Sequence, residues 1–248
     1  MYYNHIKEID IHLIDKEEDK MTNHEIKQFL VEQGVVRLYH TNTVETSLSF
    51  FRSGGLLSRG LCTDMRLPQT AQYTDSLDRD YNIFYDIFFD SVEIQRITGV
   101  SYYGPVLFVY NIDVLDTIDE GHIRITKINP EKWRRTRNES ERYFTTLEEL
   151  TESYNSRDFG QHITLTNQRV PLSFNHLEKV VLSNPRQNNN ELFEIARDTI
   201  QNVPEIRNNR ISFEIRNYQY NDRFFDTYRD ADKLKVHFAI GRPAVKSQ

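Results

Sequence analysis

The stretch VVRLYHTNTVETSLSFFRSGGLLSRG, residues 35–60, joins an apolar run to a short amphipathic segment through a His-Thr-Asn triplet that begins at His40. The run VVRLYH is rich in β-branched and aromatic residues, which predicts a buried strand. Asn42 with Glu45 three residues later resembles a capping box, and apolar residues then recur at helical spacing up to a glycine pair. The triplet is therefore expected at a strand-to-helix corner, where unpaired backbone N–H groups can meet a ligand.

The patterns along the rest of the chain predict an α+β fold. Helices are predicted over 22–34, 82–97, 140–158 and 189–205. Strands are predicted over 35–40, 102–113, 122–128, 159–172, 176–184, 210–218 and 233–241. Residues 1–22 are expected to form a peripheral arm, and 61–82 a flexible segment over a site. Single helices and irregular loops separate the strands without regular βαβ alternation, which favours an α+β domain over a doubly wound sheet.

Length and composition indicate a globular protein. The chain has 248 residues, of which 38% are hydrophobic and 27% charged, enough for a substantial core. We interpret it as one domain, with an N-terminal arm and helix (1–34), a core (35–183) and a C-terminal helix and strands (184–248). No apolar run approaches the roughly 18 residues that span a bilayer. With a single cysteine and no secretory signal pattern, the expected location is the cytoplasm.

The net charge of −6 gives no global attraction for nucleic acid, so such a partner would need a local basic patch. One dense basic cluster is present, KWRRTR at residues 132–137. Its functional interpretation is a nucleic-acid contact in which a tryptophan stacks on a base, and its alternative is a solvated loop. The candidate residues are Lys132, Trp133, Arg134 and Arg135.

Several common kinds of site have no signature in this chain. The eight histidines are scattered without HExxH or cysteine-rich spacing, so no metal site is expected. Neither a Walker lysine motif nor GxGxxG follows a predicted strand, which disfavours an ordinary mononucleotide fold. Cys62 has no histidine signature beside it and GxSxG is absent, so a thiol or serine nucleophile is not indicated.

The segment LYHTN, the helix after it and GGLLSRG resemble the opening of DarT-like ADP-ribosyltransferases. The later segments YGPVLFVYNIDVL and ITLTNQRVPLSFNHLEKVVL follow in the order of that family's central strands. The resemblance implies mixed and antiparallel sheets split around a cleft for NAD, with flanking helices. It also implies an enzyme that splits NAD at the nicotinamide–ribose bond and transfers ADP-ribose to an acceptor.

The resemblance also assigns roles to residues. His40 would hold a ribose or the nicotinamide end of NAD, and Thr41 and Asn42 would add hydrogen bonds, with Tyr39 beside them. Arg59, in LLSRG, would neutralise the diphosphate, for which a guanidinium is well suited. An aromatic side chain of the set Tyr81, Phe84, Tyr85 and Phe88 could stack on nicotinamide or on an acceptor base, and we select Tyr85 as the candidate.

The family places a catalytic glutamate on a late strand, where its carboxylate stabilises an oxocarbenium-like ribose. The matching position here is expected to be Gln161, in FGQHITL. Either the chain is a naturally altered member or a catalytic glutamate was replaced to silence it, and we favour the second because the change is minimal. The remaining interpretation is that Gln161 is an ordinary strand residue and that the match is displaced by a few positions.

Three functional hypotheses follow from the resemblance. The first is an ADP-ribosyltransferase that modifies DNA or RNA, as a toxin or antiphage effector with an antitoxin partner. The second is a catalytically inactive nucleotide-binding or partner-binding module of the same fold. The third is an NAD hydrolase, in which water attacks in the same site.

Overall fold

The structure is a computed structural model that describes residues 20–95, 103–135, 138–185, 190–217, 228 and 230–241. Nearly all of the expected N-terminal arm lies outside the described residues. Helices and strands alternate irregularly, as predicted for an α+β fold. No described helix is long and apolar enough to cross a membrane.

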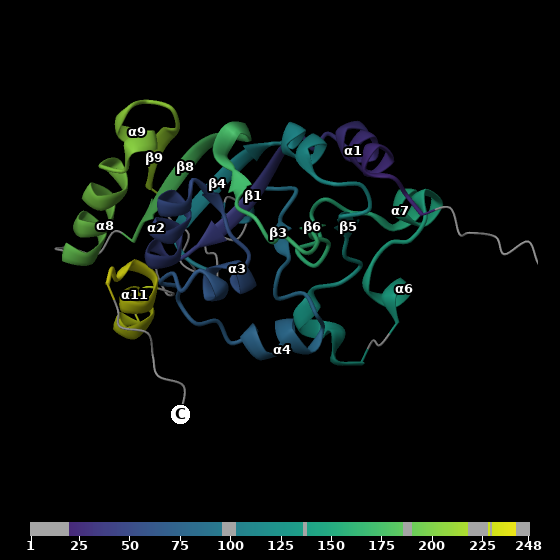
Figure 1. The fold of residues 1–248 in the computed structure, drawn as a ribbon, viewed down its shortest axis with the longest axis horizontal. Coiled ribbons are helices and arrows are strands. Elements are labelled where there is room, and N and C mark those ends of the chain that lie inside the picture. Colours follow the sequence, from purple (N-terminus) through teal and green to yellow (C-terminus); the bar gives the residue numbers. More distant parts are fainter. Residues whose placement is uncertain are drawn as a thin grey trace, which may run out of the picture.

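Two main sheets divide the molecule (Figure 1). The larger has the order β1-β4-β8-β9, from β1 (Arg37–Asn42), β4 (Val106–Asn111), β8 (Leu177–Asn184) and β9 (Ser212–Asn217). Its pairs are antiparallel except for β8 and β9, which are parallel. The smaller, antiparallel sheet has the order β3-β6-β5, from β3 (Ile87–Phe89), β6 (Ile163–Leu165) and β5 (Ile123–Ile125). A separate pair joins β2 (Gly55–Leu56) to β7 (Leu172–Ser173).

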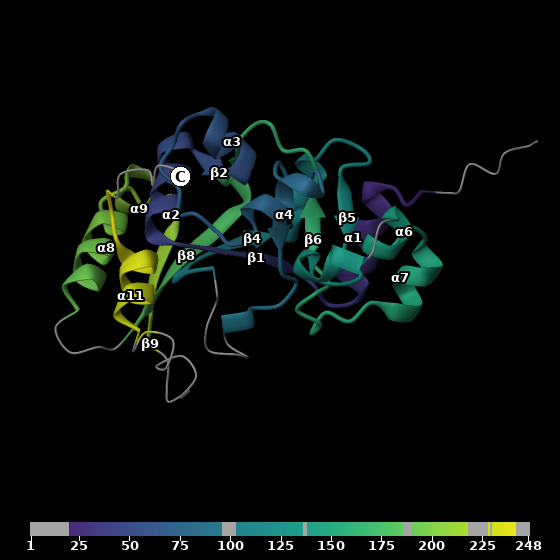
Figure 2. The same ribbon diagram turned by 90° about the horizontal axis from the view of Figure 1, so that it is seen from below.

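Helices flank both sheets (Figures 1 and 2). Beside the larger sheet are α2 (Val44–Ser53), α8 (Glu191–Gln201), α9 (Pro204–Arg207) and α11 (Ala231–Phe238). On the side of the smaller sheet are α1 (Asn23–Glu32), α6 (Glu139–Arg142) and α7 (Leu147–Ser153). The shorter elements are α3 (Arg59–Asp64), α4 (Asp75–Asp80) and the 3₁₀ helices η1 (Ile112–Thr117), η2 (Pro130–Arg135) and η3 (Phe174–His176).

The two sheets meet where the end of β3 reaches β1. Tyr39 and Asp90 form an isolated antiparallel bridge, with backbone N···O distances of 3.0 and 2.9 Å. In the larger sheet His40 stands opposite Phe108 of β4, which in turn stands opposite Val180 of β8. Phe108 and Val180 are fully buried, so His40 lies beside the hydrophobic core of the larger sheet.

The strongest local signals of the sequence are confirmed. Thr22 and Glu25 form the capping box of α1, and the apolar runs that contain β1 and β4 are strands. The helix after the polar triplet also forms, but Thr43, not Asn42, is its N-cap, because the Thr43 side chain accepts the hydrogen bond of Thr46 N. Asn42 instead remains in β1.

Three predicted segments differ from the structure. Residues 82–97 were expected to be a helix, but they contain β3, since pairing with β6 buries Ile87 and Phe89. The predicted strand over 233–241 is helical in α11, where Leu234 and Phe238, four residues apart, are buried together. The segment 61–82, expected to be irregular, holds most of α3 and all of α4. Within the predicted helix over 140–158, by contrast, the structure has α7, and α6 ends at Arg142, near the beginning of that range.

Candidate functional site

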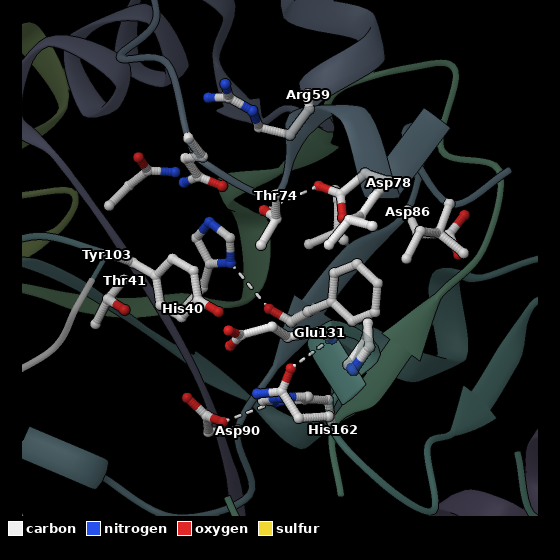
Figure 3. Close-up of a pocket in the computed structure, with 18 of the residues that line it drawn as sticks. His40, Thr41, Arg59, Thr74, Asp78, Asp86, Asp90, Tyr103, Glu131 and His162 are labelled. Carbon is white, nitrogen blue, oxygen red and sulfur yellow. Dashed lines mark hydrogen bonds and ion pairs between the residues drawn. The ribbon is translucent and has the colours of Figure 1, made fainter. Parts of the chain in front are cut away.

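A pocket opens where the two sheets meet (Figure 3). It encloses about 910 Å³, open solvent at its mouth included. Its walls come from β1, from β3 and the turn before it, from α4 and its approach, from the start of η2 and from the residue that precedes β6. All four residues of the Tyr-His-Thr-Asn stretch, Tyr39 to Asn42, line it, and so does Arg59.

His40 is a half-buried residue whose ring has two different environments. Its Nδ1 lies 2.9 Å from the backbone carbonyl oxygen of Phe88. A carbonyl oxygen only accepts hydrogen bonds, so Nδ1 carries the proton and Nε2 of the neutral ring is an acceptor. Nε2 is shielded from solvent and has no hydrogen-bond partner among the described residues. Burial lowers the pKa of His40, which favours this neutral form.

An unsatisfied buried acceptor is costly, on the order of 1–3 kcal/mol, so its presence in a pocket wall indicates a place for a ligand donor. The ring of His40 is held by contacts with Phe50 and Phe89, at centroid distances of 6.0 and 5.8 Å. The Nε2 atom is therefore fixed in position before any ligand arrives.

Arg59 lies in the pocket wall, but it is already engaged by protein groups. Its Nε and Nη2 donate to the two carboxylate oxygens of Asp75 at 2.9 and 2.7 Å, and its Nη1 donates to Thr70 O at 2.8 Å. These contacts use three of the five N–H groups of a guanidinium. Arg59 thus fixes the segment before α4 as one wall of the pocket.

Acidic side chains, which the sequence patterns did not identify, make up much of the lining. Asp78, Asp86, Asp90 and Glu131 are all among the lining residues. Burial, and then the nearby Asp75 carboxylate, raise the pKa of Asp78 to about 6. Burial likewise raises the pKa of Asp86 to about 6. At neutral pH the lining therefore carries negative charge.

His162 is a second pocket histidine that the sequence analysis missed. It directly precedes β6, and its Nδ1 lies 3.0 Å from Oδ1 of Asp90. Both residues line the pocket with His40 (Figure 3). The pairing was hidden because Asp90 follows β3, in the segment predicted to be helical.

Gln161 occupies a different place from the one expected. It is not part of the pocket lining. Its Oε1 accepts a hydrogen bond from Asn155 N at 2.6 Å, and its Nε2 donates to Ser153 O at 3.1 Å. Both ends of the amide thus hold the turn after α7. A glutamate here would direct a carboxylate oxygen at the Ser153 carbonyl, so the position suits glutamine for structural reasons.

Two further candidates also have structural contacts. Tyr85 lies outside the pocket lining, where its hydroxyl donates to Asp64 at 3.0 Å and Arg169 lies 3.3 Å from the centre of its ring. Trp133 is fully buried, donates through Nε1 to Ile128 O and packs on Tyr143. Its ring is therefore not available to stack on a base.

Of the other candidates in the basic segment, the structure describes the side chain of Lys132 alone. Lys132 is exposed and follows Glu131 at the pocket rim. The side chains of Arg134 and Arg135 lie outside the described part of the structure. Among the described residues, no group of three histidine, cysteine or carboxylate side chains is placed to hold a metal ion.

No family model and no curated protein matches the chain. Solved structures similar to it include DarT of Thermus sp. 2.9 in complex with ADP-ribosylated ssDNA, with a TM-score of 0.45 and 15% identity over 74% of this chain and 95% of that one. The same protein in complex with NAD+ gives a TM-score of 0.44 and 14% identity over 73% and 96% of the two chains. DarT is the family that the LYHTN and GGLLSRG segments resemble.

Proposed function

We propose that this pocket binds NAD+ and that the protein cleaves its nicotinamide–ribose bond to transfer ADP-ribose to a nucleic acid, DNA or RNA. The observation that carries the proposal is His40 Nε2, a shielded acceptor without a partner among the described residues, in a pocket lined by carboxylates. It can accept a hydrogen bond from a ribose hydroxyl or from the carboxamide of nicotinamide.

The charge of the lining supports the same ligand. The nicotinamide ring of NAD+ carries a positive charge, and its departure leaves positive charge on the ribose. Fixed carboxylates near that ribose stabilise charge that develops only near the transition state. Asp78, Asp86 and Glu131 supply such groups in the pocket, and Gln161 is not needed for this role.

The segments that carry the family resemblance also fold around this pocket. The LYHTN segment ends β1 in its wall, and Leu57 and Arg59 of GGLLSRG line it from another side. Segments that resemble the opening of a family of NAD-dependent transferases thus lie together at one cavity, although helix α2 separates them in the sequence.

The acceptor and the biological role complete the proposal. Lys132 places an exposed positive charge next to Glu131, at the rim where an acceptor strand would approach. Together with the resemblance, this favours a nucleic-acid acceptor and the role of a cytoplasmic toxin or antiphage effector with an antitoxin partner. The same pocket with water as acceptor would make the protein an NAD hydrolase.

Incubation with labelled NAD+ and separate pools of DNA, RNA and protein tests the proposal. We expect nicotinamide release and label in one of the nucleic-acid pools. The H40N variant keeps an amide N–H where Nδ1 donates to Phe88 but removes the Nε2 acceptor, so its affinity for NAD+ should fall about tenfold or more, which is about 1.4 kcal/mol. H122N, at a histidine outside the pocket lining, should bind as the parent does.

The possible results separate the alternatives. Nicotinamide release without label in any pool would identify a hydrolase. Binding of NAD+ without release would identify an inactive binding module. No binding of NAD+, or equal binding by H40N and the parent protein, would contradict the proposed site.

A further inference from the structure

His162 is held in a defined orientation by three contacts. Its backbone N donates to Thr126 Oγ1 at 2.7 Å, and its ring meets the edge of Phe88 with 6.1 Å between centroids. Its Nδ1 pairs with Asp90 Oδ1 at 3.0 Å. The side chains of His162 and Asp90 are only 11% and 21% exposed, so the pair is largely screened from bulk water.

The pairing fixes the tautomer of the ring. A carboxylate accepts hydrogen bonds, so Nδ1 of His162 carries a proton, and Nε2 of the neutral ring has a free lone pair. A base oriented by a third group in this way is the arrangement that general base catalysis requires. Asp90 would also stabilise the imidazolium that forms when Nε2 takes up a proton.

The two histidines of the pocket are thus set up for different tasks. His40 donates through Nδ1 to a neutral carbonyl, and burial lowers its pKa, so it remains a neutral hydrogen-bonding group. His162 donates through Nδ1 to the carboxylate of Asp90, which orients its ring. The other titratable groups that line the same cavity are Tyr39, Arg59, Asp78, Asp86, Asp90, Tyr103 and Glu131.

We propose that His162, positioned by Asp90, is the base that removes the proton of the acceptor during ADP-ribose transfer. This inference rests on the proposed function. As the bond between ribose C1 and the nicotinamide nitrogen breaks, its electron pair stays with nicotinamide, which leaves as a neutral molecule. A lone pair of the acceptor forms the new bond to C1, and the acceptor proton passes to Nε2 of His162.

Glu131 is one of the carboxylates of the lining that could also accept a proton, and its contacts favour His162 over it. Glu131 is exposed, and its Oε2 already accepts the hydroxyl of Tyr73 at 2.7 Å. His162 is more enclosed and has an orienting partner of its own. A base of this kind typically contributes about 10²–10⁴-fold to the rate.

The main test compares H162Q with H122Q. Glutamine at 162 keeps a polar amide of similar size but cannot take up a proton at neutral pH. We expect H162Q to lower kcat for transfer about a hundredfold or more while the Kd for NAD+ changes by less than about threefold. His122 is a matched control, because its Nδ1 is likewise bonded, to Thr166 at 3.1 Å, on the same sheet but outside the pocket lining. H122Q should keep the parent rate.

The D90N variant tests the positioning role of Asp90 through the pH profile of the rate. Without the carboxylate charge, the His162 imidazolium is less stable, so the acidic limb of the profile should move to lower pH. A structural role alone would lower stability without moving that limb. If H162Q fails to fold, as judged by its melting curve, D90N decides the question in its place.

The role of His162 would be overturned if H162Q transferred ADP-ribose at the parent rate, or if D90N left the acidic limb of the pH profile unmoved. In either case, NAD+ cleavage by the parent protein would leave the proposed function intact. A parent protein that neither binds nor cleaves NAD+ would overturn both.

Discussion

At the scale of single residues, the pocket contains a buried carboxylate whose negative charge reduces the stability of the folded protein. Asp86 is buried, and its Oδ1 accepts a hydrogen bond from Asn167 N at 2.9 Å. Its pKa is raised from 3.8 to about 6, mainly by burial. A folded-state pKa above the unfolded value means that the ionised group destabilises the fold at neutral pH. Such groups are retained where function needs them.

We therefore predict that D86N is more stable than the parent at pH 7. A shift of about two pKa units corresponds to at most about 3 kcal/mol in the free energy of unfolding. Because the folded state binds the proton more tightly, the penalty is fully present above pH 6 and disappears as the pH falls through 3.8. The difference in the free energy of unfolding between D86N and the parent should therefore also disappear as the pH falls. Urea denaturation at pH 7 and pH 4 measures it.

Asp113 provides a control, because its pKa is shifted in the opposite direction to that of Asp86. Its carboxylate is on the surface and accepts a hydrogen bond from Lys27 Nζ at 2.8 Å, and that interaction lowers its pKa. D113N should therefore give no gain in stability at pH 7. If D86N is no more stable than D113N at pH 7, burial does not destabilise the Asp86 carboxylate.

The residue scale also shows what the sequence could not determine. Family resemblance placed the late-strand position at Gln161, but the pocket residue is His162, one position further. Neighbouring residues in an extended chain point to opposite sides, so an error of one position exchanges a pocket residue for a structural one. Only the partners of each side chain, Ser153 and Asn155 for Gln161 and Asp90 for His162, distinguish the two.

At the scale of elements, the pocket depends on how closely β4 approaches the end of β1. Gly104, just before β4, has a φ of +139°, and a Cβ there would lie 2.3 Å from Asn42 O and 2.5 Å from Thr43 N. These are backbone atoms between the polar triplet and the N-cap of α2, so they cannot rotate out of the way. The absence of a side chain at Gly104 thus allows the strand-to-helix corner to form.

We predict that G104A displaces this corner and reduces both stability and NAD+ affinity. The control is G121A, where φ is +78° and no atom lies within 4 Å of an added Cβ. Both variants place alanine at positive φ, but the φ of Gly104 lies outside the left-handed helical region, so the difference between the variants reports the clash together with the greater backbone strain there. Chemical denaturation and NAD+ titration give the two readouts. Equal stability and affinity of the two variants would contradict the role of Gly104.

The elements that could be predicted are those whose local signals agree with their packing. Thr22 and Glu25 cap α1 through side chains only three positions apart in the chain, and β4 is an apolar run buried on both sides. In contrast, 82–97 has apolar residues at helical spacing, and only pairing with β6 makes part of it a strand. Since Asp86 directly precedes β3 and Asp90 directly follows it, the wrong secondary structure also concealed the acidic wall.

At the scale of the whole molecule, the pocket belongs to both sheets. His40 lies on β1, and the carbonyl that orients it belongs to Phe88 of β3. His162 precedes β6, and Asp90 bridges to Tyr39 of β1. A ligand in the pocket thus contacts residues of both sheets and stabilises the arrangement of one relative to the other. Global unfolding should therefore report its binding.

This coupling makes thermal unfolding a test of the charge of the pocket. At a free concentration of 100 times Kd, a ligand raises the free energy of unfolding by about 2.7 kcal/mol, equivalent to a Tm increase on the order of 5–10 °C for a chain of this size. NADH has the same two riboses and diphosphate as NAD+ but an uncharged nicotinamide ring. Since Asp78, Asp86 and Glu131 favour a positive ring, NADH at the same concentration should raise Tm less than NAD+ does. Thermal melts with each ligand make the comparison, with H40N as the variant in which both shifts shrink. Equal shifts in the parent protein would mean that the ring does not lie among these carboxylates.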